Sequence, residues 1–336
     1  MILVRFLDLK FLKSARCDDR NFKSTALVRN PYCRSGPKSR YDWGMDAPNP
    51  SAIPTFASGT PLHIGAVGLK VRDLDRLSGF YRDVLGLSVL DRGTHGATLG
   101  AGGVPIIHLE HEPNAKPDDT RTAGLYHTAF LMPTRADLAR WILHVARHKV
   151  PLTGASDHGV SEAFYLDDPE GNGMEVYFDR PAASWQWTGN ELKMITDPLD
   201  IDDILREVPS AAPYPGAPEG LRIGHVHLRV GDIARAETFY RDALGLEVTR
   251  RRHGASFMSS GRYHHHIAGN VWHSAGAGPR DQNRAGLAWL SLEAADDAAF
   301  AAVTDRLAQA GLQTAAIAAG IETADPWGTR LRVTRA

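Results

Sequence analysis

The chain has 336 residues, 38 basic and 39 acidic side chains for a formal net charge of −1, and 43% hydrophobic residues. This length predicts about two domains, each able to bury a core of its own. The near-neutral balance excludes the broad basic surface with which proteins bind nucleic acid. No apolar run approaches the roughly 20 residues that span a membrane.

The N-terminal segment differs in composition from the rest of the chain. Its first 43 residues carry ten Lys or Arg against four Asp, and Met45 opens a stretch rich in Pro, Ala and Ser. We expect residues 1–60 to be a disordered leader and the functional chain to begin near Met45. Both cysteines, Cys17 and Cys33, lie in this segment. The body of the chain therefore has no thiol, which favours a protein of the reducing cytoplasm.

An internal repeat organises the body of the chain. The segments that begin at Pro61 and Gly220 match at a constant offset of 159 residues and share the tetrapeptide Phe-Tyr-Arg-Asp. In each copy, alternating apolar residues predict a strand, and apolar residues at helical spacing predict a helix that ends at Gly86 or Gly245. Further strands follow in both copies.

A second, weaker pair of repeats begins at Gly124 and Gly286. Each copy closes with a turn and a strand, at Asp168-Pro169 and at Asp325-Pro326. The predicted fold class is therefore α+β, with four βαβββ modules at residues 63–113, 124–179, 222–273 and 285–335.

The order of the repeats predicts the domain organisation. Modules one and two form a first domain at 61–180, and modules three and four a second domain at 221–336. The linker between them, 181–220, ends in a Pro/Ala/Gly run. Helical spacing at 200–207 predicts one short helix within it.

Several of these motifs together resemble a known family. The helices FYRDVLGL and FYRDALGL, the strand HVHLRV and the segment DHGVSEAFYLDDPEGNGMEVY resemble the vicinal oxygen chelate superfamily, and within it the type I extradiol (catechol 2,3-) dioxygenases. The resemblance extends from about residue 61 to the end of the chain. It implies that paired modules curl into two half-open barrels with a divalent metal inside.

If the modules are comparable, one structural position can be compared across all four. The first-strand positions are Ala66, His127, His225 and Trp289, and the closing-strand positions of the even modules are Glu175 and Arg332. His127, His225 and Glu175 supply two imidazoles and one carboxylate, the ligand set of non-haem Fe(II) oxygenases. We therefore expect Fe(II) there, with Mn(II) as a substitute.

This ligand set predicts how the modules pair. In the familiar extradiol enzymes the last two modules build the site, whereas here the ligands lie in modules two and three. Module two must then pair with module three, and module one with module four, with the metal where modules two and three meet. The alternative is that consecutive modules pair and a second subunit completes the site, so a homo-oligomer stays open.

Each ligand also has an ordinary structural interpretation. A single strand histidine is more often a hydrogen-bonded core residue than a ligand. His227 competes with His225, because residues i and i+2 of a strand face the same way. The family motif places the ligand at the start of the strand and so favours His225. Met174 and Val176 mark the opposite, apolar face beside Glu175.

The resemblance also implies three catalytic residues. In GRYHHHIAGN the register with Ile267-Ala268 assigns the acid/base role to His265, and alternation predicts His264 and His266 on the other face. The segment DHGVSEAFY implies a second histidine, His158, and a substrate-facing tyrosine, Tyr165. Their separation is shorter here than in the familiar enzymes, and Tyr165 has the alternative interpretation of a packed aromatic residue.

The resemblance implies Fe(II)- and O2-dependent cleavage of catechol or a substituted catechol to a 2-hydroxymuconic semialdehyde. The partners are then a small aromatic diol and dioxygen. One alternative is a non-oxidative glyoxalase-type isomerase, lyase or thiol transferase of the same superfamily. Such a site needs a fourth ligand near Gly269, at the position of Glu110 in module one, where no ligand stands. A second alternative is a non-catalytic small-molecule binding protein.

Overall fold

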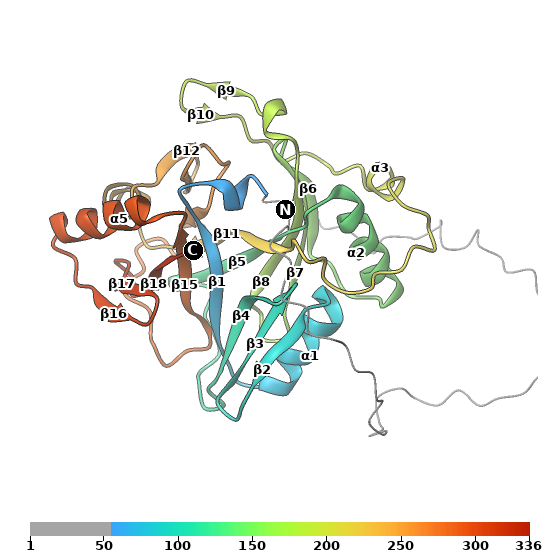
Figure 1. Cartoon of the computed structure of the whole chain (residues 1–336), viewed down its shortest axis with the longest axis horizontal. Helices are drawn as coiled ribbons and strands as arrows, with labels where there is room; N and C mark the ends of the chain where they lie inside the picture. The colour runs from blue at the N-terminus through green and yellow to red at the C-terminus, as the bar shows by residue number, and fades with distance from the viewer. Residues whose placement is uncertain (1–54) are drawn as a thin grey trace, which may run out of the picture.

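The computed structural model describes residues 55–336 (Figure 1). The predictions for Cys17, Cys33, the start near Met45 and a disordered leader over residues 1–54 lie outside the described residues. Residues 55–60, also assigned to that leader, are ordered. At the beginning of the described part, a short 3-10 helix, η2 (Ala57–Gly59), places the Ala57 side chain in the protein interior. No helix in this part of the chain combines the length and apolar character needed to cross a membrane.

The described chain contains the four predicted modules. The elements of module one are β1 (Leu62–Val71), α1 (Leu74–Leu85), β2 (Ser88–Arg92), β3 (Gly96–Ala101) and β4 (Val104–His111). Those of module two are β5 (Gly124–Leu131), α2 (Arg135–Arg147), β6 (Gly154–Asp157), β7 (Ser161–Asp167) and β8 (Gly173–Asp179). Those of module three are β11 (Arg222–Arg229), α4 (Ile233–Glu237), the π-helix η4 (Thr238–Ala243), β12 (Glu247–Arg252), β13 (Ala255–Ser259) and β14 (Ile267–Asn270). Those of module four are β15 (Gly286–Ala294), α5 (Asp297–Gln309), β16 (Ala315–Ile317), β17 (Gly320–Ala324) and β18 (Arg330–Arg335).

The connection between modules two and three contains little regular structure. Its elements are η3 (Ala182–Ser184), β9 (Trp187–Thr188), β10 (Glu191–Leu192) and α3 (Ile201–Leu205). The short helix predicted at 200–207 is therefore confirmed as α3.

Two eight-stranded sheets account for all the module strands. One has the order β16-β17-β18-β15-β1-β4-β3-β2 and is called here the outer-module sheet, because it joins modules one and four. The other, β12-β13-β14-β11-β5-β8-β7-β6, joins modules two and three and is called the inner-module sheet. The module pairing predicted from the ligand positions is confirmed. The units 61–180 and 221–336 are repeats of sequence, and each contributes strands to both sheets.

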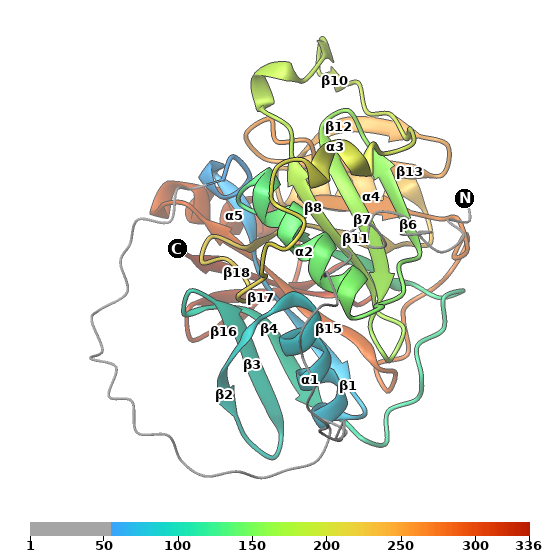
Figure 2. The ribbon, with the colours of Figure 1, turned by 90° about the vertical axis from the view of Figure 1, so that its right-hand side faces the viewer.

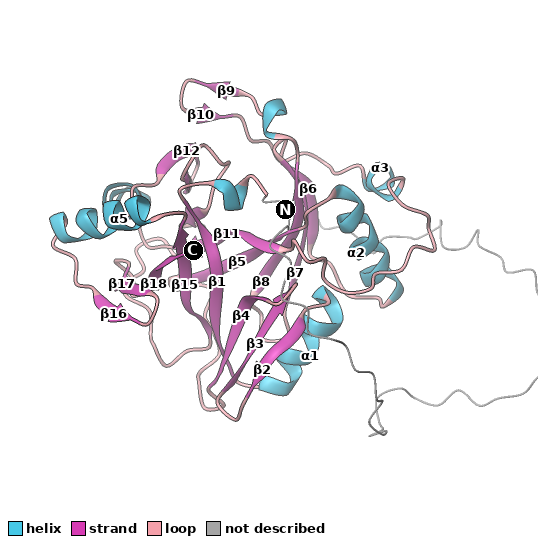
Figure 3. Cartoon of the chain, in the orientation of Figure 1, coloured by secondary structure: helices cyan, strands magenta, loops and turns pink. Residues whose placement is uncertain are grey.

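The two sheets share one pattern of strand pairing. At the centre, β1 pairs with β15 and β11 with β5, both antiparallel. Beside them, the first and last strands of each module lie parallel, which requires a crossover connection that the helices provide. An Asp or Thr side chain caps the first turn of α1, α2, α4 and α5 by accepting a backbone N–H. Figure 3 shows the strands at the centre of the molecule and the helices outside them.

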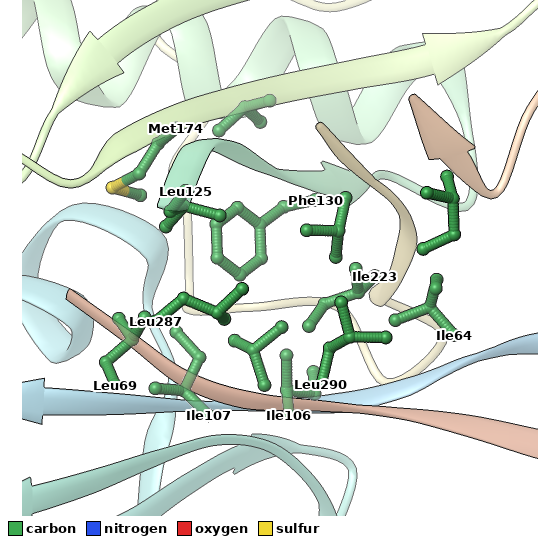
Figure 4. Close-up of a cluster of buried hydrophobic side chains, with 14 of the residues drawn as sticks. Ile64, Leu69, Ile106, Ile107, Leu125, Phe130, Met174, Ile223, Leu287 and Leu290 are labelled. Carbon is green, nitrogen blue, oxygen red and sulfur yellow. The ribbon is translucent and has the colours of Figure 1, made fainter. Parts of the chain in front are cut away.

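The main hydrophobic core lies between the two sheets (Figure 4). Leu69 and Leu290 from the outer-module sheet face Leu125 and Phe130 from the inner-module sheet, and all four side chains are buried. Helices α1 and α2 lie side by side at one margin of this core (Figure 2). Each sheet thus buries one face against the other sheet and the helices, and the opposite face is available for a site.

Consecutive modules are joined by two equivalent buried hydrogen bonds. Tyr81 of α1 donates to Asp168 Oδ2 of module two over 2.9 Å, and Tyr240 of η4 donates to Asp325 Oδ2 of module four over 2.9 Å. The repeated Phe-Tyr-Arg-Asp and Asp-Pro motifs therefore contact each other. Because module one lies in a different sheet from module two, and module three in a different sheet from module four, these bonds connect the two sheets.

Candidate metal centre

A break in the alternation of β11 orients the histidines of this strand. The pairing of β11 with β5 shifts register between Ile223 and His225, so Ile223 and Val226 both face the core. His225 and His227 then project from the other face of the sheet. Packing requires a glycine between Ile223 and His225, because a Cβ at Gly224 would collide with the hydroxyl of Tyr177.

The three predicted ligands meet on this face of the inner-module sheet. They come from β5 (His127), β8 (Glu175) and β11 (His225), and their ligand atoms all lie within 4.8 Å of one another. His127 Nε2 is 3.1 Å and His225 Nε2 is 3.3 Å from Glu175 Oε2. All three residues are buried.

This arrangement fits a divalent metal. His127 Nε2 lies close to Glu175, but the two groups are outside hydrogen-bond geometry. This buried nitrogen has no hydrogen-bond partner among the residues that the structure describes. A buried polar atom of this kind costs free energy unless a further group satisfies it. A cation between the two imidazoles and the carboxylate satisfies all three. Nitrogen and oxygen donors of this type suit Fe, Mn, Ni or Zn.

The protonation states also suit metal binding. Burial alone would raise the pKa of Glu175, but the neighbouring His225 and His127 outweigh it and hold this pKa well below its usual value. Burial lowers the pKa of His225 to about 4, against the opposing effect of Glu175. At neutral pH the site therefore offers a carboxylate and a neutral imidazole, the forms that coordinate metal ions.

His227, the competitor of His225, has its Nε2 atom occupied by a hydrogen bond. The amide of Asn270 lies 3.0 Å from His227 Nε2, and the Asn270 carbonyl oxygen accepts from the backbone N–H of Trp272. The amide therefore donates to His227 Nε2. His227 packs 5.0 Å from the His127 ring, ring centre to ring centre, as a neighbour of the ligand group.

Tyr165 and His158 form a hydrogen-bonded pair beside the ligands. Tyr165 lies opposite Glu175 in the β7–β8 pairing, with its ring 5.7 Å from that of His127. His158 Nδ1 donates to the Ile195 carbonyl over 2.9 Å, so its Nε2 accepts from the Tyr165 hydroxyl over 2.7 Å. Burial, with Glu175 close by, raises the pKa of Tyr165 well above its usual value, so the hydroxyl stays protonated.

His265 lies against His225, with 4.0 Å between ring centres. Burial, with the nearby His225 and His264, lowers the pKa of His265 well below its usual value. The prediction that His264 lies on the other face is wrong. Residues 261–266 form a turn before β14, so strand alternation does not apply to them. His264 Nδ1 lies 2.7 Å from His265 Nδ1, whereas His266 points away toward Ala57 and Thr60.

Sequence reasoning missed three polar neighbours of the ligands: Tyr177, Asp179 and Tyr263. Tyr177 and Asp179 follow Glu175 at two and four residues in β8, and strand alternation alone places them on the ligand face. Tyr263 lies in the turn before β14, and no periodic signal in the sequence indicates its position. Its hydroxyl bonds both Tyr177 and Asp179.

The comparisons with known proteins identify the family of the chain. The model of the Glyoxalase/Bleomycin resistance protein/Dioxygenase superfamily matches residues 63–176 and 222–332. The chain is also 38% identical over 255 residues to the catechol-2,3-dioxygenase of Bacillus subtilis (strain 168), covering 74% of this chain and 88% of that protein. The chain belongs to this superfamily, and within it to the extradiol dioxygenases.

Two further relatives extend the comparison. The biphenyl-2,3-diol 1,2-dioxygenase 3 of Rhodococcus globerulus is 30% identical over 125 residues, 33% of this chain and 60% of that protein. A crystal structure of a candidate dioxygenase from Bacillus subtilis superposes with a TM-score of 0.54 at 17% identity, over 81% of this chain and 84% of that chain. The sequence relatives place this extradiol dioxygenase among the oxidoreductases, and the structural likeness shows the shared fold.

The pairing of β11 with β14 corrects the expected position of a fourth ligand. In module two, Glu175 pairs with Ala129, which lies two residues after the predicted ligand His127. In module three, the residue two after His225 is His227, and it pairs with Ala268. The position expected near Gly269 is thus Ala268, one residue earlier, because the repeat offset is not constant through the hairpin. Alanine offers no ligand atom, so this position adds none to the three predicted ligands.

Proposed function

We propose that the protein is an Fe(II)-dependent extradiol dioxygenase, with Mn(II) as a substitute metal, that cleaves catechol or a substituted catechol to a 2-hydroxymuconic semialdehyde. In this reaction the ring bond adjacent to the diol breaks and both atoms of O2 enter the product. The observation that carries the proposal is the convergence of His127, Glu175 and His225 in a chain 38% identical to a catechol-2,3-dioxygenase.

The metal would be held by His127, Glu175 and His225. When bound, it supplies positive charge that favours the deprotonated diol and open positions for the diol and dioxygen. The choice of a divalent metal ion follows from the composition of the ligand set. Two neutral imidazoles and one carboxylate leave a single net positive charge on a divalent ion.

Side chains around the ligands then have separate roles. His265 takes a proton from a diol hydroxyl and returns it later in the reaction. Tyr165, oriented by His158, hydrogen-bonds a diol oxygen and orients the ring. The aromatic side chains of Phe257 and Tyr126 flank His265 and His127, with ring centres 5.1 and 5.4 Å away. They offer the apolar contact that a flat aromatic substrate requires.

The cytoplasm is the proposed location. The composition supports it, since residues 34–336 contain no cysteine for a disulfide. The inner-module sheet takes all three ligands from one chain, so the proposed site needs no residue from a second subunit.

The test is an oxygen-dependent assay of protein purified without air and loaded with Fe(II). We expect catechol to yield a yellow semialdehyde with one O2 consumed per ring. We also expect His225→Ala and Glu175→Gln to lose both the metal and the product. Stoichiometric Ni or Zn with no O2 uptake over a panel of catechols would contradict the proposal and favour the isomerase, lyase or transferase alternative.

A further inference from the structure

We propose that Asp179 is a positioning residue that sets the tautomers of two histidines in the site, His265 and His225. The inference rests on the proposed function, in which His265 exchanges a proton with the diol and His225 is a metal ligand. Asp179 lies outside the ligand set, and its role is to control which ring nitrogen of each histidine carries the proton.

Asp179 occupies the end of the strand that carries Glu175. Glu175, Tyr177 and Asp179 lie at alternate positions of β8 and therefore on the same face of the inner-module sheet. The Asp179 side chain is 14% exposed. Its two carboxylate oxygens bind two different partners, so one charged group ends two separate chains of hydrogen bonds.

The first chain leads to His265. Asp179 Oδ1 lies 2.9 Å from His264 Nε2, and a carboxylate accepts, so His264 carries its hydrogen on Nε2. A neutral imidazole has a single N–H, and His264 Nδ1 is then an acceptor. His265 Nδ1, 2.7 Å away, must donate to it. His265 Nε2 is left unprotonated, which is the form of a general base.

The second chain leads to His225. Tyr263 donates to Asp179 Oδ2 over 2.8 Å, so the Tyr263 oxygen accepts from the Tyr177 hydroxyl 2.7 Å away. The Tyr177 oxygen in turn accepts from His225 Nδ1 over 3.3 Å. His225 Nε2, the atom nearest Glu175, thus keeps its lone pair for a metal.

The surroundings exclude alternative partners for these groups. Tyr177, Tyr263 and His264 are fully buried. The buried Trp185 packs over Tyr263 and His264 with ring centres 5.9 and 5.4 Å away. Water therefore has no access to these three side chains to replace a hydrogen bond that is lost. If donor and acceptor exchange in one bond, the other bonds of that chain must reverse as well.

Asp179→Asn is the decisive substitution, because it replaces one acceptor oxygen with a donor NH2. Only one of the two chains can then keep its direction. A metal on His225 Nε2 requires a hydrogen on Nδ1, so the chain through His264 must reverse and move the His265 proton to Nε2. The expected cost is about 10²-fold in kcat, at the lower end of what a positioned general base contributes, with KM little changed.

The tautomers are read from nitrogen-15 NMR spectra of the full-length protein, labelled on histidine and loaded with Zn(II) as a diamagnetic probe. We expect His265 to carry its proton on Nδ1 in the wild type and on Nε2 in Asp179→Asn. The loss of kcat is measured separately on the Fe(II)-loaded forms. Asp305→Asn, an exposed change of the same kind on α5, is the matched control and leaves both readouts unchanged.

Two further variants separate the chains. The first combines Asp179→Asn with His264→Asn. The amide oxygen introduced at position 264 replaces His264 Nδ1 as the acceptor for His265 Nδ1. The His265 proton therefore returns to Nδ1, and kcat rises again. Tyr263→Phe cuts only the second chain. It should weaken Zn(II) binding about 10-fold, at the lower end of the range for residues that support metal ligands, and leave the His265 tautomer unchanged.

The proposal is overturned if wild-type His265 carries its proton on Nε2, or if Asp179→Asn changes neither the tautomer nor kcat. If Asp179→Asn does not fold, Tyr263→Phe without any loss of Zn(II) affinity overturns the second chain. A tautomer that moves as expected in a protein that does not cleave catechol supports the positioning role and contradicts the proposed function. An unmoved tautomer in an active dioxygenase does the reverse.

Discussion

The two sheets share their strand order but carry opposite chemistry at the same structural position. Where the inner-module sheet has His127, Glu175 and His225, the outer-module sheet has Trp289, Arg332 and Ala66. Both sheets also have a break in alternation just before this position, in β11 and in β1. The backbone at this position is therefore similar in both sheets, and the proposed ligands differ from their counterparts in three side chains.

In the outer-module sheet the corresponding groups satisfy one another. Trp289 Nε1 donates to Glu110 Oε1 over 2.7 Å, and the Arg332 guanidinium stacks 3.8 Å from the centre of the Trp289 ring. Arg332 also donates to Glu322 over 2.9 Å. Glu110, Trp289 and Arg332 line part of a cavity of about 440 Å3. A guanidinium where the other sheet has its ligand carboxylate repels a cation, so this face is unsuited to a metal.

The largest effect is expected when a residue of the outer-module sheet is transferred to the metal centre. His127→Trp should abolish metal binding and activity, because an indole nitrogen donates a hydrogen and has no lone pair for a metal. Metal content per chain, measured on protein purified from metal-supplemented medium, checks the first result, and catechol turnover checks the second.

The reverse exchange is the control. Trp289→His restores one imidazole, but Arg332 and Ala66 stay, so metal content and turnover should match the wild type. A second metal equivalent in Trp289→His would show that the outer-module sheet needs only one ligand, and the contrast between the sheets would fail.

The next effect compares the residues opposite the closing-strand position. Tyr165 stands opposite Glu175, and Glu322 stands opposite Arg332. Tyr165→Phe should lower kcat about 10²-fold without loss of metal, because the phenol oxygen that hydrogen-bonds and orients the diol disappears. Glu322→Gln should leave kcat unchanged. Steady-state kinetics with metal analysis distinguish the two, and equal kcat values for Tyr165→Phe and the wild type would return Tyr165 to a packing role.

The module architecture could be predicted because it repeats. The apolar strand pattern of β1, the helical spacing from Leu74 to Val84 and the stop at Gly86 each have a counterpart in module three, and each is a local property of the chain. Gly86 has a φ of 75°, a left-handed conformation that glycine adopts without strain. The pairing of modules followed from chemistry, since only modules two and three contain a complete ligand set.

The polar network around the site could not be predicted in the same way. Strand alternation placed His264 on the far side, but the turn before β14 brings it beside His265. The same turn positions Tyr263, whose partners lie in β8, more than 80 residues earlier in the chain. Turn geometry depends on tertiary contacts that periodicity does not contain. The likeness of repeats also fails where hairpins differ by one residue, as at Ala268.

A smaller effect tests the bonds that join the two sheets. Tyr81→Phe and Tyr240→Phe each remove a hydroxyl that donates to a buried aspartate, Asp168 or Asp325. Each should lower the free energy of unfolding by about 1–3 kcal/mol and leave metal content unchanged. Urea denaturation followed by fluorescence measures the loss.

Tyr214→Phe is the matched comparison for these two variants. Its hydroxyl donates to the backbone carbonyl of Leu85 in a half-buried position, so the loss should be about 0.5–1.5 kcal/mol. If Tyr81→Phe costs no more than Tyr214→Phe, the Tyr–Asp bonds do not hold the sheets together.

The smallest effect concerns the outer-module face itself. Trp289→Phe removes the hydrogen bond to Glu110 and weakens the stacking of Arg332. Because Glu110 and Arg332 are partly exposed, water replaces part of the loss, and we expect about 0.5–1.5 kcal/mol in unfolding free energy. Turnover should be unchanged, since this face is separated from the metal centre by the core between the sheets. A clear fall in kcat with stability preserved would mean that the two faces communicate, and the outer-module sheet would then contribute to catalysis as well as to the fold.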